Sequence, residues 1–156
     1  MRRYGIVLGM VFSLVACGEK QLPPAAPLTD FSCQLSLVDV PSEMKVGGKP
    51  VAITVKVVNT SAAVWPAKPE GKDLHRAREV NIGYHWNRNG GDVVEGDRAF
   101  LPADLASKQS AEVKLAVFPP SAEGNYVLRV EPVQESVGWF AGRGDCKAQA
   151  NVRVIP

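Results

Sequence analysis

The sequence has few of the residues from which enzymes and metal sites are usually built. It contains two histidines, three cysteines and only 7% aromatic residues among its 156 positions. Neither His75 nor His85 has a partner at the spacing of a zinc motif or a catalytic triad. The sequence therefore predicts no catalytic residues, no metal and no cofactor, and the protein is expected not to be an enzyme.

Charge of one sign does not accumulate along the chain. The 18 basic and 16 acidic residues leave a formal net charge of +2, and Arg2 and Arg3 supply two of the positive charges in the leader. Binding to nucleic acid requires a concentrated basic surface. We therefore exclude nucleic acid as a partner. The composition, 46% hydrophobic and 22% charged, is typical of one globular domain.

The apolar stretch at the start of the chain is too short to cross a bilayer. Residues 4–15 are mostly apolar and follow Arg2 and Arg3, whereas a membrane-spanning helix needs about 20 apolar residues. A positive start followed by a short apolar stretch is typical of a secretory signal. We expect residues 1–16 to be a signal peptide and not part of the folded protein.

The signal segment ends in Leu14-Val15-Ala16-Cys17-Gly18. This stretch resembles the lipobox of bacterial lipoproteins, which implies that Cys17 receives a diacylglycerol and that its new amino group is acylated, for example with palmitate. Several acyl chains give firm membrane anchoring. Gly18 stands where inner-membrane retention usually requires Asp, so the resemblance implies an outer-membrane lipoprotein that faces the periplasm. The alternative is an ordinary secretory signal that ends near a cysteine.

The segment after Cys17 is rich in proline. Residues 21–27 contain three prolines, which favour an extended and semi-rigid backbone. The sequence predicts that residues 17–30 form a tether and that residues 31–156 form one domain held off the membrane.

Two cysteines remain if Cys17 carries lipid. Cys33 and Cys146 lie 113 positions apart, and an even pair in an oxidising compartment predicts a disulfide bond. The alternative is two free buried thiols.

Side chains alternate most clearly in residues 80–86. Val80, Ile82, Tyr84 and Trp86 fall on one face of a strand and Asn81, Gly83 and His85 on the other. A face with such large apolar side chains needs an opposing sheet. We expect the central strand of a β-sandwich, with Trp86 as the core anchor and His85 on the outward face.

Other stretches alternate in the same way, and turn residues separate them. The predicted strands are residues 31–39, 51–59, 93–101, 111–118, 125–131 and 146–154. An immunoglobulin-like antiparallel β-sandwich of seven or eight strands follows, in which the first and last strands pair in parallel. Gly124-Asn125-Tyr126 resembles a tyrosine corner and places Tyr126 in the core. The alternative is a small antiparallel barrel.

Three aromatic residues are predicted to gather at one end of this sandwich. Trp65 lies in the loop after residues 51–59, Trp139 and Phe140 lie in the loop before residues 146–154, and these loops share an end of such folds. The rings either form a binding surface or plug the open end of the sandwich.

Three stretches resemble tryptophan-rich immunoglobulin-like domains of the four-tryptophan type. They are Asn59 to Trp65-Pro66, Pro120–Leu128 with Gly124 and Tyr126, and Gly138-Trp139-Phe140. The resemblance implies a module that binds an envelope protein or assembly. Similar domains accompany surface-polysaccharide enzymes, which leaves glycan binding as an alternative. Asn59 to Trp65 also resembles a loop of bacterial immunoglobulin-like inhibitors of cysteine peptidases, and inhibition is a third alternative.

Overall fold

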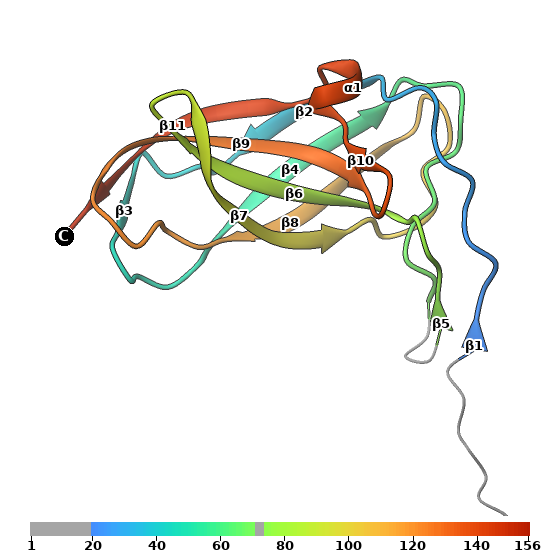
Figure 1. The fold of residues 1–156 in the computed structure, drawn as a ribbon, viewed down its shortest axis with the longest axis horizontal. Helices are drawn as coiled ribbons and strands as arrows, with labels where there is room; N and C mark the ends of the chain where they lie inside the picture. The colour runs from blue at the N-terminus through green and yellow to red at the C-terminus, as the bar shows by residue number, and fades with distance from the viewer. Residues whose placement is uncertain (1–19, 71–73) are drawn as a thin grey trace, which may run out of the picture.

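The computed structural model describes residues 20–70 and 74–156, and these fold as an immunoglobulin-like β-sandwich, as predicted (Figure 1). The predicted signal peptide and the lipidation site Cys17 lie outside the described residues, so both stay predictions. In the described part of the chain, no helix is long and apolar enough to span a membrane. The elements are β1 (Lys20–Gln21), β2 (Cys33–Val38), β3 (Glu43–Lys45), β4 (Val51–Asn59), β5 (Leu74–His75), β6 (Val80–Arg88), β7 (Gly91–Phe100), β8 (Ser110–Val117), β9 (Gly124–Gln134), β10 (Gly138–Trp139), α1 (Ala141–Gly144) and β11 (Ala148–Ile155).

Two sheets make up the sandwich. The six-stranded sheet has the order β3-β11-β9-β6-β7, with β10 added to β9, and the three-stranded sheet has the order β2-β4-β8. All pairs in these sheets are antiparallel except β3 with β11. Strands β1 and β5 form a separate short parallel pair. Figure 1 shows the two sheets lying face to face.

The predicted parallel pairing of the first and last strands involves different residues. Strand β2, from the predicted strand 31–39, pairs antiparallel with β4 and not with β11. The partner of β11 is β3, with Met44 opposite Val154, in a stretch predicted to be a connection. Asp39 has a φ of 65° and Pro41 has no amide hydrogen, so the chain leaves the three-stranded sheet here and joins the other.

The core is organised around β6, as the alternation predicts. Trp86 is fully buried, and its ring meets Tyr84 and Tyr126 edge-on at centroid distances of 6.4 and 5.9 Å. Trp86 Nε1 donates to the carbonyl of Phe118 at 2.8 Å. The amide of Phe118 donates to the Tyr84 hydroxyl at 2.9 Å, and burial raises the pKa of that hydroxyl. The prediction of Trp86 as the core anchor is confirmed.

The tyrosine corner is also present. Tyr126 is buried, and its hydroxyl donates to the carbonyl of Ala122, four residues earlier, at 3.0 Å. This bond holds the turn that leads into β9 against the start of the strand. The prediction that Tyr126 belongs to the core is therefore confirmed.

Cys33 and Cys146 form a disulfide bond, as predicted, with their Cα atoms 5.3 Å apart. Cys33 begins β2 in the three-stranded sheet, and Cys146 precedes β11 in the six-stranded sheet. The bond therefore joins the two layers near one end of the sandwich.

The predicted tether 17–30 is partly packed against the domain. The fully buried side chain of Gln134 accepts a hydrogen bond from the amide of Leu28 at 2.8 Å and donates to the carbonyls of Ala26 and Arg78 at 3.0 and 2.9 Å. The Leu28 side chain is buried with the core. The end of the proline-rich segment is thus fixed to the sandwich, and the packed part of the chain begins before residue 31.

Replacing Gly96 by Ala should destabilise the fold by about 3 kcal/mol, because a Cβ there would enter the buried ring of Tyr84. Gly91→Ala is the matched control in the same strand, since its Cβ would meet nothing within 4 Å. Urea unfolding should leave the control within about 0.5 kcal/mol of the wild type. Equal midpoints for both variants would contradict the position of Tyr84.

Removing the disulfide should destabilise the domain by roughly 4–5 kcal/mol, because the bond closes a loop of 113 positions in the unfolded chain. The experiment compares Cys33→Ser/Cys146→Ser with the wild type in urea, with and without reductant. The reductant should lower the wild-type midpoint and leave the variant unchanged. A wild-type urea midpoint that is the same with and without reductant would argue against the disulfide bond.

Candidate functional site

The aromatic end of the sandwich is sealed. Trp65 and Phe140, predicted as binding residues, are fully buried. Their rings meet edge-on with centroids 4.9 Å apart, and Phe31 packs on the other side of Phe140 at 4.9 Å. The prediction that these two side chains form a binding surface is therefore wrong. An open sandwich end exposes core side chains, and these rings cover them.

The loop from Asn59 to Trp65 is fixed by hydrogen bonds between its own residues. Asn59 donates to the carbonyls of Ala63 and Leu105 and accepts from the amide and hydroxyl of Ser61. The Ser61 hydroxyl in turn accepts from Trp65 Nε1 at 3.2 Å. Buried loop groups need such partners, so the pattern that resembles an inhibitor loop has a structural role here.

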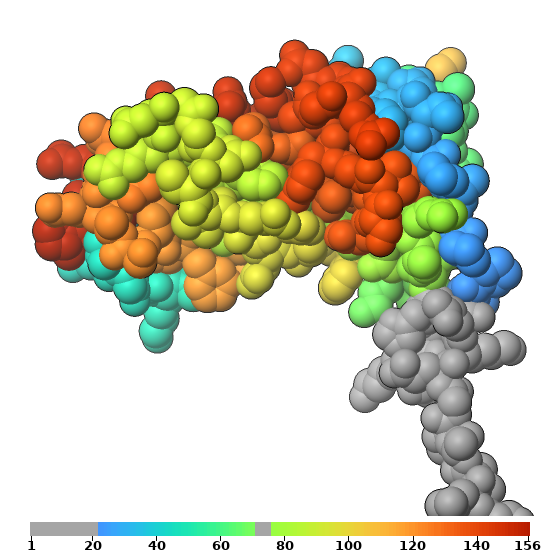
Figure 2. Space-filling view, viewed as in Figure 1, coloured from blue at the N-terminus to red at the C-terminus, as the bar shows by residue number. Residues whose placement is uncertain are grey.

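Trp139 lies apart from the other two aromatic residues, on the outer face of the six-stranded sheet. Strand β10 pairs with the end of β9 and carries Trp139 over β6. A Cβ at Gly83 would lie 2.8 Å from the Trp139 ring, so the missing side chain makes room for the indole. The Arg98 guanidinium lies 4.4 Å from the ring centroid. Trp139 keeps part of its surface exposed, and Figure 2 shows the segment around it, in orange-red, spread over this face.

His85 is buried beneath this cover, although the alternation predicted an outward and solvated position. It points away from the core, but the Trp139 ring lies 4.2 Å away and leaves only 6% of the residue exposed. His85 Nδ1 has no hydrogen-bond partner and lies 3.6 Å from the fully buried carboxylate of Glu131. Arg129 Nε and the amide of Ala141 donate to that carboxylate, each at 2.8 Å.

Sequence reasoning missed the pair of His85 and Glu131. Both residues fall on the polar face of an alternating strand, and nothing local indicates that a distant loop covers them. A cavity of about 350 Å³ lies beside them. In the part of the chain that the structure describes, no group of three or more His, Cys, Asp or Glu residues could hold a metal ion.

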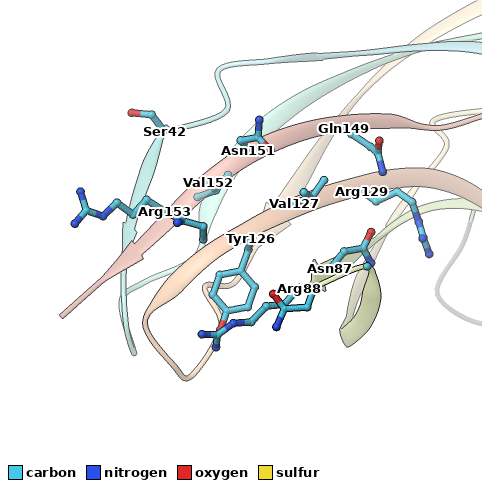
Figure 3. Close-up of a pocket in the computed structure, with 13 residues that line it drawn as sticks. Ser42, Asn87, Arg88, Tyr126, Val127, Arg129, Gln149, Asn151, Val152 and Arg153 are labelled. Carbon is cyan, nitrogen blue, oxygen red and sulfur yellow. The ribbon is translucent and has the colours of Figure 1, made fainter.

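An open groove occupies the uncovered half of the same outer face. Its volume is about 670 Å³, and it runs over β9, β11 and the β6–β7 hairpin (Figure 3). Five side-chain amides line it: Asn87, Asn89, Asn125, Gln149 and Asn151. None of the described residues that line it is Asp, Glu or His.

The pairing register places these amides in rows across neighbouring strands. Asn151 on β11 and Asn87 on β6 both lie opposite Val127 of β9. Gln149 lies opposite Arg129, and Asn125 opposite Arg153. Neighbouring strands are about 4.8 Å apart, so the rows form a flat grid of donors and acceptors.

Three arginines line the groove, and they differ in their ion pairs. Arg129 is neutralised by Glu131 at 2.8 Å and by Asp92 at 2.7 Å. Arg153 is largely exposed and lies 3.8 Å from Glu43. Arg88 has no carboxylate within ion-pair distance among the described residues, and its Nη1 lies 3.3 Å from the Tyr126 hydroxyl, to which it donates. Of the three, Arg88 is the arginine without a carboxylate partner among the described residues.

Comparisons with known proteins find only distant likenesses among solved structures. No family model and no curated protein matches the chain. Two solved structures of a CARDB domain from Pyrococcus furiosus, one of them in complex with di-metal ions, are each 16% identical to this chain, with a TM-score of 0.45. Each match covers 79% of this chain, and the two matches cover 92% and 95% of the solved chains. AvmM, which catalyses macrocyclization in alchivemycin A biosynthesis, is 14% identical with a TM-score of 0.43 over 81% of this chain and 90% of its own. Likenesses this distant transfer no function to this chain.

Proposed function

We propose that this chain is a lipid-anchored binding module of a bacterial cell envelope that recognises a polysaccharide through the groove of the six-stranded sheet. The lining of that groove is the observation that carries the proposal. It consists mainly of side-chain amides and arginines on rigid strands. Amides both donate and accept hydrogen bonds, which suits the hydroxyl groups of sugars.

A glycan fits this surface better than the envelope protein that the sequence favoured. Protein interfaces centre on aromatic or apolar residues that fill pockets on the partner. Of the rings predicted for that role, Trp65 and Phe140 are buried inside the sandwich, and Trp139 is half-buried and does not line the groove. The groove itself offers Val127 and a flat polar grid, with no exposed aromatic anchor among its described residues.

The position of the groove suits an anchored protein. The N-terminal segment is fixed to Gln134 at the end of the sandwich that carries β5 and β10, whereas the groove lies at the opposite end, near the C-terminus (Figure 1). An anchor on Cys17 would hold the first end near the membrane and turn the groove away from it. The protein would then act at the outer membrane, facing the periplasm.

We propose binding without catalysis. The described residues that line the groove include no carboxylate or imidazole to act as a general acid or base. The described residues that line the cavity beside His85 and Glu131 include no Ser, Thr or Cys that this pair could activate. The groove therefore suits recognition of a ligand, and we propose this as its role.

Blocking the groove should abolish polysaccharide binding. Asn151→Trp places a bulky ring at an exposed position in the middle of the grid, and affinity for polysaccharide extracted from the producing cells should fall about tenfold or more. Ser36→Trp, at an exposed strand position on the opposite sheet, is the matched control and should bind normally. Affinity electrophoresis measures both. Equal retardation of the two variants would count against the groove.

Lipid anchoring is tested by labelling cells with radioactive palmitate. The wild type should incorporate label and sediment with outer membranes, and Cys17→Ala should lose both properties because it has no thiol to acylate. Gly18→Asp should keep the label but move to the inner membrane. Release of unlabelled wild-type protein into the periplasm would show that the leader is an ordinary secretory signal.

A further inference from the structure

Arg88 is an exposed cation on the open half of the sheet. It ends β6 and is followed by the turn Asn89-Gly90, where φ is 52° and 83°. Positive φ at both central residues is the signature of a tight hairpin turn, so the backbone of Arg88 is held rigidly. The guanidinium lies 5.3 Å from the centre of the Tyr126 ring.

The neighbours of the Arg88 guanidinium hold it in place without neutralising its charge. Tyr126 accepts one of its hydrogen bonds, and a Cβ at Gly124 would lie 3.0 Å from Nη2. The absent side chain at Gly124 thus lets the planar group lie close to the turn. Figure 3 shows Arg88 beside Tyr126 at the edge of the groove.

The three arginines of the groove differ in how far carboxylates neutralise them. Arg129 is already paired with two carboxylates. Arg153 lies toward β3 and Glu43, and Figure 3 shows its side chain turned away from the others. Glu123 borders an adjoining hollow that Arg88 and Arg153 also line, but it forms no ion pair with Arg88 and does not line the groove itself. Among the described residues, the Arg88 guanidinium has no carboxylate partner, and it stands beside the neutral amides of the groove.

We propose that the groove selects an acidic polysaccharide, with the carboxylate of a uronic acid residue bound by Arg88 and the sugar hydroxyls bound by Asn125 and Asn151. The Asn87 amide already donates to Asp92. This inference rests on the proposed polysaccharide-binding function and names its ligand class. A guanidinium matches a planar carboxylate with two parallel hydrogen bonds. One unpaired arginine suits one carboxylate per bound repeat.

Polygalacturonate and its fully methyl-esterified form are the matched probes, because esterification changes only the carboxyl group and removes its charge. Titration calorimetry with the folded protein should show binding of polygalacturonate at low salt. Affinity for the methyl ester should be at least about tenfold lower, since a hydrogen bond to a charged group is lost. Binding that does not distinguish the two probes overturns the inference.

Arg88→Gln removes the proposed carboxylate ligand at an exposed position and keeps a polar side chain. It should lower affinity for polygalacturonate about tenfold and abolish the preference over the methyl ester. Lys56→Gln removes one exposed positive charge from the opposite sheet and is the control, with little expected effect. Equal losses in both variants would mean non-specific attraction and would overturn the inference.

Failure of this inference can be told from failure of the proposed function. If extracted polysaccharide binds and Asn151→Trp blocks it, while polygalacturonate does not bind or Arg88→Gln has no effect, the groove is a glycan site for neutral or phosphate-bearing sugars and the uronate assignment is wrong. If Asn151→Trp and Arg88→Gln instead change only the sedimentation coefficient, this face joins two copies of the chain and both proposals fall.

Discussion

Two hydrogen bonds join side chains of β6 to the backbone of Phe118, the residue after β8. The sandwich depends on this constraint. Trp86 and Tyr84 project from the six-stranded sheet, and both bind the backbone of Phe118, which follows a strand of the opposite sheet. The Trp86 indole donates to its carbonyl and the Tyr84 hydroxyl accepts from its amide, so both backbone polar groups of Phe118 are satisfied. The two layers are thereby fixed in spacing and in register, which leaves no room for a side chain at Gly96.

The outward face of the same strand decides where a ligand can reach the protein. Gly83 leaves space for the Trp139 ring, and that ring shields His85 and Glu131 from water. Half of the sheet is closed in this way by a segment from the loop before β11. The other half keeps its amide grid open (Figure 3). Binding is therefore expected at the end of the sheet farthest from the N-terminal segment.

The fold could be predicted because its signals are local. Alternation in residues 80–86 identifies the central strand and its core face, and the approach to Tyr126 identifies the corner. The site could not be predicted, because it depends on partners distant in sequence. Alternation tells which face a side chain takes but not whether a loop will cover that face, so His85 was misplaced. The groove arises from the register of β6, β9 and β11, and no single stretch of sequence carries it.

The disulfide bond has a mechanical consequence for a molecule pulled by its N-terminus. Tension entering along the segment fixed by Gln134 reaches Cys33 at the start of β2, an edge strand that would otherwise unzip from β4 one hydrogen bond at a time. The covalent link to Cys146 transfers that load to the chain entering β11, which is paired on both sides. Force is then shared between both layers, and peeling of the edge gives way to shearing of many bonds at once.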